Sequence, residues 1–553
     1  MKVIIVGGVA AGASAAARLR RLDERAKITI FEKGKHVSFA NCGLPYYVGN
    51  VIRAEGSLLL VNPELFKERF NIEVKTEHEV VSIDRARREV EVKDLRSWQV
   101  FRASYDVLVL ATGATPLKPK MEGIDLPGVM TLRSVEDARA IKEKALGGKK
   151  VAVVGGGFIG LEAAENLVHL GKEVRLYQLL PQVLPAYDPE VVAYVHHELR
   201  ANGVHLHLGA EVQGFAEESG RLTVKTKEGD DRGYDFVLFA IGVRPDSGLA
   251  AAAGLELTPR GSIVVDEHLR TSDPSIYAAG DAVAILNQVT GERQMIALAG
   301  PANKEGRIVA DNIAGRDAVY RGALGTSILK VFSLAVGMVG IGEKDALRRG
   351  IKARSVLLAP TNHATYYPGA STMILKLVYE EGSQRILGAE ALGPSGVDKR
   401  IDIIATAMKA GMKASELKEL DLAYAPPFGS AKDPVNMLGF VAENLEDGLL
   451  ETFHYDEVDA LPRDGSITLL DVRTEEEYRA GHIEGFKNIP LDELRERLEE
   501  IPSGKKVYLH CLSGLRSYLA ARLLSNEGYD ASSLDGGYMV YMSYQADVAA
   551  KEN

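Results

Sequence analysis

The chain has 553 residues, a length that corresponds to about three to five domains of ordinary size. Hydrophobic residues make up 46% and charged residues 26%, which excludes a disordered or fibrous protein. The formal net charge of -10 argues against a broad nucleic-acid-binding surface, since such a surface needs a basic face.

The sequence shows no membrane or export segment. The apolar run Met1–Val6 is too short for a signal peptide, and Val331–Gly342 falls well below the roughly 20 residues that span a bilayer. We therefore expect a cytoplasmic protein with no membrane partner. The chain has only two cysteines, Cys42 and Cys511, which excludes a disulfide scaffold or a four-cysteine metal site, and we predict no bound metal.

The first 320 or so residues alternate apolar strands with helical stretches, a pattern typical of α/β domains with parallel sheets. Two halves resemble each other, because Lys2–Val6 and Lys150–Val154 both lead into a glycine turn and then an alanine-rich helix. A further strand and turn, Ile276–Asp281, follow the second half. The duplication predicts two Rossmann-like nucleotide-binding domains, the second inserted into the first.

The second half carries a complete G-x-G-x-x-G motif at Gly155, Gly157 and Gly160. These glycines allow a tight turn, close approach of a pyrophosphate, and close packing of helix against strand. The next strand ends at Gln178, where an acidic residue would favour NAD and arginine would favour NADP. Because Gln178 is neutral, the nicotinamide preference stays open.

The first half has an incomplete version of this motif at Gly7, Gly8 and Gly12, with Val9 in place of the middle glycine. Glu32 closes the following strand at the spacing of a ribose-binding carboxylate, which favours a second dinucleotide site.

Three further motifs, Ala111–Gly113, Ala240–Pro245 and Tyr277–Asp281, resemble the fingerprints of flavoprotein disulfide reductases with two dinucleotide-binding domains. The resemblance implies a glutathione-reductase-like fold with FAD in the first domain and NAD(P)H in the inserted one. The FAD-binding residues it implies are Gly7, Gly8, Ala10, Ala11, Gly12, Glu32, Lys33, Val80, Ala111, Thr112, Gly113, Arg133, Gly280, Asp281 and Ala299. The NAD(P)-binding residues are Gly155, Gly157, Phe158, Ile159, Gly160, Glu162, Gln178 and Gly242.

The segment Ser38–Tyr46, around Cys42, is similar to the single-cysteine active site of coenzyme A disulfide reductases and of their persulfide- and polysulfide-reducing relatives. Tyr47 stands where glutathione-type reductases have a second cysteine, so no disulfide can form within this site. The simplest route is a mixed disulfide, Cys42–S–S–R, which reduced flavin cleaves. Cys42 must attack as a thiolate, a state that helix N-termini and positive dipoles favour.

The same resemblance implies that Tyr366 and Tyr424 come from the partner subunit of a homodimer, where a phenol can stabilise a departing thiolate. The CoA-binding residues it implies are Arg18, Arg21, Ser38, Asn41, Asn303 and Lys432. Phe70 stands where some relatives have lysine, which leaves one phosphate contact open.

Residues 455–545 resemble a rhodanese domain, in which a strand delivers Cys511 into a short loop ahead of a helix. Backbone N–H groups of such a loop form an anion cradle, and Arg516 adds positive charge. The six-residue loop from Cys511 to Arg516 favours sulfur over phosphate, since related phosphatases use a loop one residue longer. His482 is interpreted as structural.

We therefore predict an FAD-binding domain formed by residues 1–120 and 246–322, with an NAD(P)H-binding domain at 121–245 inserted between its two parts. An α+β dimerisation domain at 323–445, a linker at 446–462 and a rhodanese α/β domain at 463–553 are predicted to follow. We predict an NAD(P)H-dependent enzyme with FAD and CoA as cofactors. It would reduce CoA persulfides, polysulfides and CoA disulfide through Cys42, while Cys511 carries sulfane sulfur.

Two alternatives stay open at this point. One is a sulfur-trafficking carrier whose flavin is a redox sensor. The other is an NADH oxidase or peroxidase whose cysteine cycles through sulfenic acid, although Ala10 stands where those relatives usually have histidine. The sequence does not decide whether CoA is cofactor or substrate, which sulfur compound is reduced, or how sulfur passes between Cys42 and Cys511.

Overall fold

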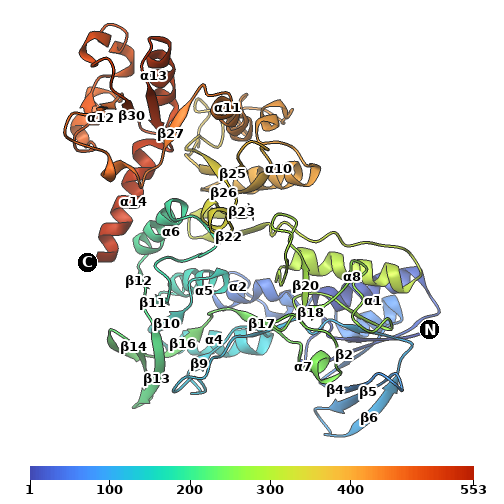
Figure 1. Ribbon diagram of the computed structural model, residues 1–553. Coiled ribbons are helices and arrows are strands. Elements are labelled where there is room, and N and C mark those ends of the chain that lie inside the picture. Colours follow the sequence, from blue (N-terminus) through green and yellow to red (C-terminus); the bar gives the residue numbers. More distant parts are fainter. Residues whose placement is uncertain (553) are drawn as a thin grey trace. The chain divides into compact units, whose positions relative to one another are not determined.

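The computed structural model describes residues 1–552, which form two compact units (Figure 1). Unit 1 comprises Met1–Pro181 and Gly203–Gly325, and unit 2 comprises Gln182–Asn202 and the chain from Thr326 onward. Both are built from α/β layers, which confirms the predicted fold class. No helix formed by residues 1–552 has the length and apolarity to cross a membrane.

The first half of unit 1 contains a five-stranded parallel sheet in the order β19-β7-β1-β2-β3. Except for the edge strand β3, its strands are rich in buried apolar residues because both faces of the sheet are covered, as is usual for parallel sheets. They are β1 (Lys2–Val6), β2 (Lys27–Glu32), β3 (Glu73–Thr76), β7 (Val107–Leu110) and β19 (Ile276–Ala278). Helices α1 (Ala10–Leu22) and α8 (Ala299–Ile313) pack against each other.

The second half of unit 1 repeats this plan with the sheet β12-β11-β10-β16-β9. Its strands are β9 (Val129–Met130), β10 (Lys150–Val154), β11 (Glu173–Gln178), β12 (Val204–Leu208) and β16 (Phe236–Phe239). Each half also has an antiparallel three-stranded sheet. In the first half it precedes β7 and consists of β4 (His78–Asp84), β5 (Glu89–Asp94) and β6 (Val100–Ser104). In the second half it precedes β16 and consists of β13 (Val212–Glu218), β14 (Arg221–Thr226) and β15 (Gly229–Tyr234). This is the duplication that the sequence predicts.

The remaining elements of unit 1 connect these sheets. The helices are α2 (Leu44–Val48), α3 (Pro63–Phe70), α4 (Val135–Gly147), α5 (Phe158–His169) and α7 (Gly248–Ala252). The short strands are β8 (Ala114–Pro116), which pairs with β17 (Val243–Pro245), and β18 (Ile263–Val264), β20 (Val283–Leu286) and β21 (Arg293–Gln294).

Unit 2 contains an antiparallel sheet in the order β22-β23-β26-β25-β24. Its strands are β22 (Ser327–Val331), β23 (Leu334–Gly340), β24 (Ala353–Leu358), β25 (Ile374–Glu380) and β26 (Ile386–Gly393), and its helices are α9 (Glu343–Arg348), α10 (Val397–Ala410) and α11 (Pro434–Glu446).

Helix α6 (Pro189–Ala201) falls within the sequence range predicted for the NAD(P)H-binding domain, yet it belongs to unit 2. The reason is a buried ion cluster. The Lys376 ammonium, on β25, contacts the carboxylates of Asp188 at 2.8 Å and Glu343 at 2.7 Å, and also that of Glu190. Lys376 thereby fills the space between three carboxylates whose spacing would otherwise suit a metal ion.

The C-terminal part of unit 2 has a parallel sheet in the order β27-β31-β30-β28-β29. It contains β27 (Glu451–Phe453), β28 (Thr468–Asp471), β29 (Lys487–Asn488), β30 (Val507–His510) and β31 (Ala531–Leu534), with helices α12 (Glu475–Ala480), α13 (Leu515–Asn526) and α14 (Gly537–Glu552). The segment 446–462 was predicted to be a linker, but in the structure it contributes the edge strand β27 to this sheet. Phe453, Tyr455 and Val458 are buried between its charged residues and hold it in the domain.

Candidate active site

The first glycine turn shapes a nucleotide site at the carboxyl end of β1. Gly7 has φ of +97°, and a Cβ on Gly12 would lie 1.9 Å from the Gly7 carbonyl oxygen, so both positions require glycine. Glu32 accepts a hydrogen bond from the Gly8 N–H at 2.9 Å and one from the Gly34 N–H at 2.8 Å. These two hydrogen bonds fix the Glu32 carboxylate beside the glycine turn, which is the position expected of a ribose-binding residue.

A cavity of about 470 Å³ opens above this turn. Twelve of the predicted FAD-binding residues line it: Gly7, Ala10, Ala11, Glu32, Lys33, Val80, Ala111, Thr112, Gly113, Arg133, Gly280 and Asp281. Gly8 and Gly12 are not among its lining residues, and Ala299 lines a neighbouring cavity instead. Burial raises the pKa of Asp281, while Arg133 lowers it. The glycine turn and the elongated lining fit FAD.

Of the three motif glycines in the second turn, Gly157 is the one that leaves room for a ligand. A Cβ on Gly155 would lie 2.3 Å from the Ala240 carbonyl oxygen, and one on Gly160 would lie 1.9 Å from that of Gly155. A Cβ on Gly157 would meet no atom within 4 Å. Gln178 accepts a hydrogen bond from the Gly156 N–H at 3.1 Å. The motif thus has the open approach that a pyrophosphate needs.

The other predicted NAD(P)-binding residues fall around this turn. Phe158, Ile159 and Glu162 lie in the first turns of α5, and Gly242 follows β16 with φ of +135°.

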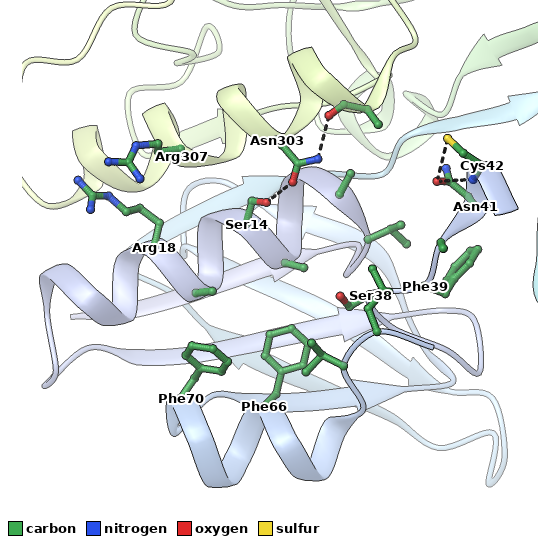
Figure 2. A pocket seen from close by; sticks show the side chains of 18 of the residues that line it. Ser14, Arg18, Ser38, Phe39, Asn41, Cys42, Phe66, Phe70, Asn303 and Arg307 are labelled. Atoms are coloured by element: carbon green, nitrogen blue, oxygen red, sulfur yellow. Dashed lines mark hydrogen bonds between the residues drawn. The ribbon is translucent and has the colours of Figure 1, made fainter. Parts of the chain in front are cut away.

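A second cavity, of about 590 Å³, contains the thiol of Cys42. Five of the six residues predicted to bind CoA line it: Arg18, Arg21, Ser38, Asn41 and Asn303. The sixth, Lys432, is exposed in unit 2. In Figure 2, Cys42 lies at one end of this cavity, while Arg18 and Arg307 lie together at the other.

The basic end of this cavity contains unpaired cations. Arg18 is bound to Asp311, with its Nε at 2.9 Å and its Nη2 at 2.7 Å from one carboxylate oxygen. Within residues 1–552, the Arg21 and Arg307 guanidiniums form no ion pair. Arg307 was not predicted from the sequence. Its position one helical turn after Asn303 on α8 is a signal that could have identified it.

Cys42 lies in a short 3-10 turn (Asn41–Gly43) immediately before α2, and its side chain is exposed. Its N–H donates to the Asn41 side-chain oxygen at 3.1 Å. The surrounding protein raises the pKa of the thiol through desolvation and through the carboxylates of Glu162 and Asp281, while Arg133 lowers it. This differs from the expectation of a thiolate favoured by a helix N-terminus, because desolvation and the two carboxylates disfavour a negative charge on the sulfur.

Helix α2 connects the cysteine segment to the glycine-motif helix α5. The Tyr46 hydroxyl donates to the Glu162 carboxylate at 3.3 Å. Burial and the neighbouring Glu165 raise the pKa of Glu162 and the hydrogen bond from Tyr46 lowers it, with a net pKa of about 7. Glu162 therefore changes its charge near neutral pH.

The second thiol, Cys511, is free and only 1% exposed. The Gly514 N–H donates to its sulfur at 3.1 Å, and the Ser517 hydroxyl lies 3.5 Å from it. The Ser533 hydroxyl supports Ser517 at 2.8 Å. These donors form the expected cradle for an anionic sulfur.

The Arg516 guanidinium is not available to pair with this sulfur, because it forms a bidentate ion pair with Glu477. His482 stacks on Tyr478, and its Nδ1 contacts the Tyr478 carbonyl oxygen at 3.2 Å. That arrangement agrees with the structural role predicted for His482.

Tyr366 and Tyr424 lie together in unit 2, with their hydroxyl oxygens 2.7 Å apart. Their side chains are unusually open for tyrosine, with 73% of Tyr366 and 46% of Tyr424 exposed. The structure thus brings the two predicted tyrosines together.

Residues 1–306 match the family model of pyridine nucleotide-disulphide oxidoreductases. The chain belongs to this family. Residues 326–434 match the dimerisation domain of the same family, and residues 454–543 match a rhodanese-like domain. Membership implies FAD and NAD(P)H as cofactors and a homodimer as the assembly.

Two solved structures match both the oxidoreductase and the rhodanese-like parts of this chain. The reduced CoADR-RHD of Bacillus anthracis is 44% identical, with a TM-score of 0.96 over 99% of this chain and 98% of that one. A NAD-dependent persulfide reductase from A. fulgidus is 40% identical, with a TM-score of 0.92 over 98% of this chain and 100% of that one. The coenzyme A disulfide reductase of Staphylococcus haemolyticus is 35% identical over its full length and 80% of this chain.

Proposed function

We propose that this oxidoreductase uses NAD(P)H to reduce CoA persulfides, polysulfides and CoA disulfide through Cys42. The observation that carries the proposal is the cavity in which Cys42 and a cluster of arginines occupy opposite ends. CoA has anionic phosphates at one end and a thiol at the other. Unpaired guanidiniums such as Arg21 and Arg307 suit phosphate, and Cys42 then meets the sulfur.

Cys42 acts as the nucleophile of the proposed reaction. Its thiolate attacks one sulfur of R–S–S–R′, which forms Cys42–S–S–R and releases R′–S⁻. Glu32, Asp281 and the Gly7 turn would hold FAD, which would supply the electron pair for the reduction. Two electrons and one proton convert the mixed disulfide into the Cys42 thiolate and R–SH, so the cycle closes without a second cysteine.

Tyr366 and Tyr424 are proposed to cover Cys42 of the partner subunit in the homodimer. Their exposure in a single chain and their shared hydrogen bond support a surface that another subunit completes. A phenol O–H at that place would donate a hydrogen bond to the departing thiolate. Lys432, also exposed, is proposed as a phosphate contact from the same unit.

Cys511 is proposed to carry sulfane sulfur as a persulfide. Its buried sulfur and the hydrogen-bond donors at Gly514 and Ser517 support a thiolate at Cys511 that accepts the sulfur. A carrier of sulfane sulfur fits the reduction of per- and polysulfides better than that of a plain disulfide, which leaves no sulfur to carry.

Steady-state NADH consumption with CoA persulfide and with CoA disulfide tests this proposal. We expect Cys42→Ser to lower the rate at least about 100-fold with both substrates, because it removes the covalent intermediate. Cys511→Ser should impair turnover of persulfide more than of disulfide. Full activity of Cys42→Ser would overturn the reductase mechanism, and equal losses in Cys511→Ser would overturn the separate role of the rhodanese domain.

A further inference from the structure

The only charged residue of the six-residue Cys511 loop is already neutralised. The Arg516 guanidinium donates from Nη1 to one Glu477 carboxylate oxygen at 2.6 Å and from Nη2 to the other at 2.7 Å. Such a two-point pair is among the strongest hydrogen-bonded arrangements of these groups. Arg516 holds the pKa of Glu477 at about 2, so the carboxylate stays ionised at any working pH.

Glu477 is fixed in this position by its own helix. It is the third residue of α12, where its carboxylate accepts the Thr474 N–H at 2.9 Å and its own N–H donates to the Thr474 hydroxyl at 3.2 Å. This reciprocal capping box orients the carboxylate independently of Arg516. The ion pair is therefore a fixed feature of the loop rather than a chance contact of mobile side chains.

The other cationic groups flanking the loop add no net positive charge. Arg473 is buried and donates to both oxygens of Asp471, from Nε to Oδ1 at 3.0 Å and from Nη2 to Oδ2 at 2.6 Å. His510, which precedes Cys511, is fully buried, and this burial lowers its pKa to about 4, so its ring is neutral at pH 7.

We infer from these pairings that Cys511 takes sulfur from the protonated end of a persulfide, R–S–S–H, and discriminates against the thiosulfate dianion. The inference rests on the proposed sulfur-carrying role of Cys511. A dianion placed against a thiolate needs a net positive charge close by, and the loop has none to spare. The neutral S–H end of a persulfide needs only the hydrogen bonds that Gly514 and Ser517 offer.

The transfer balances without any further reactant. The Cys511 thiolate attacks the terminal sulfur of R–S–S–H, so a bond forms between Sγ and that sulfur while the donor S–S bond breaks. The products are Cys511–S–S–H and R–S⁻, with no net oxidation or reduction. The same attack on thiosulfate would release sulfite and concentrate additional negative charge in the loop.

The substitution Glu477→Gln tests the inference with little structural change. An amide oxygen at this position still accepts the Thr474 N–H, so the capping box persists, but the charge that neutralises Arg516 is lost. Glu476→Gln is the matched control, because it removes an exposed charge from the same helix away from Arg516. Full-length holoenzyme is incubated without NADH with glutathione persulfide or with thiosulfate, and the persulfide on the Cys511 peptide is quantified by mass spectrometry.

For the wild-type protein we expect sulfur loading at least about tenfold faster from glutathione persulfide than from thiosulfate. Glu477→Gln should raise the thiosulfate rate about tenfold and change the persulfide rate less than about twofold, while Glu476→Gln changes neither. The persulfide rate also serves as the check that Glu477→Gln is folded.

Equal rates from both donors in the wild type, or an unchanged thiosulfate rate in Glu477→Gln, would overturn the inference while leaving the carrier role intact. Absence of sulfur on Cys511 with both donors would overturn the inference and the carrier role together. Reduction of CoA disulfide through Cys42 is measured separately, so its failure affects only the proposed reductase function.

Discussion

Cys42 is surrounded by ionisable groups that act on its thiol in opposite directions. Desolvation and the carboxylates of Glu162 and Asp281 raise the thiol pKa, and Arg133 lowers it. Glu162 itself has a pKa raised to about 7 and is hydrogen-bonded by Tyr46. Its charge therefore changes within the physiological range, and the field at the nucleophile changes with it.

This arrangement predicts the effect of Glu162→Gln on the thiol. Removing the carboxylate removes one cause of the raised pKa, so the Cys42 pKa should fall. The measurement is the pH dependence of iodoacetamide labelling at the Cys42 peptide, resolved from Cys511 by mass spectrometry. Glu68→Gln, which removes an exposed carboxylate that is not among the causes of the raised thiol pKa, is the control. A labelling midpoint that stays in place or moves upward in Glu162→Gln would contradict this account.

Single residues were predictable where the signal is local. Cys42, Cys511 and the glycines stand in short motifs whose spacing already implies their chemistry. The Arg516–Glu477 ion pair was not predictable, because the two residues are 39 positions apart and no pattern in either segment indicates the other. The raised pKa of the Cys42 thiol likewise depends on Glu162 and Asp281, which only the fold brings near it.

At the scale of elements, the glycine motif at the start of α5 contains one glycine needed for packing and another that leaves space for a ligand. Gly160 must lack a side chain because the Gly155 carbonyl lies against it, whereas Gly157 faces open space. The two glycines of one motif therefore have different physical requirements.

This difference predicts two distinct phenotypes. Gly157→Ala should keep the fold and the FAD content but raise the KM for NADH about tenfold, since the methyl group occupies the approach of the pyrophosphate. Gly160→Ala should lower the free energy of unfolding by about 1–3 kcal/mol, because helix and turn must move apart. Nucleotide kinetics and denaturant titration measure the two effects. A destabilised Gly157→Ala protein with unchanged KM would refute the assignment.

Elements with a strong local pattern were predicted closely. β1 and β10 begin and end where the apolar runs Lys2–Val6 and Lys150–Val154 indicate. β27 was predicted as part of a linker, because a strand of three residues at a sheet edge has too few apolar positions to stand out from its acidic surroundings.

At the scale of the whole chain, unit 2 joins segments that are far apart in sequence. Asp547, near the C-terminus, contacts His196 at 2.8 Å and Arg200 at 2.7 Å, both on α6. The Tyr455 hydroxyl donates to Glu190 at 3.1 Å. No local pattern predicts contacts that span hundreds of residues, and so α6 could not be assigned to this unit from sequence.

These contacts predict that the rhodanese domain stabilises the rest of unit 2. Truncation after Asp447 would remove Asp547 from buried His196 and the Tyr455 hydroxyl from buried Glu190. A buried polar group that loses a hydrogen-bond partner costs about 1–3 kcal/mol. We expect the unfolding temperature of unit 2 to fall by at least about 5 °C in calorimetry. Asp547→Asn in the full-length chain, which keeps the packing of α14, should produce a smaller fall. An unchanged transition in the truncated protein would contradict the prediction.

The account as a whole depends on a single thiol that holds the sulfur being reduced. The most direct measurement is peptide mass spectrometry after incubation with CoA disulfide in the absence of NADH, with a second sample quenched after NADH is added. The account predicts a CoA mixed disulfide on the Cys42 peptide that disappears when NADH is supplied. NADH consumption with CoA disulfide while Cys42 carries no adduct at any stage would contradict it.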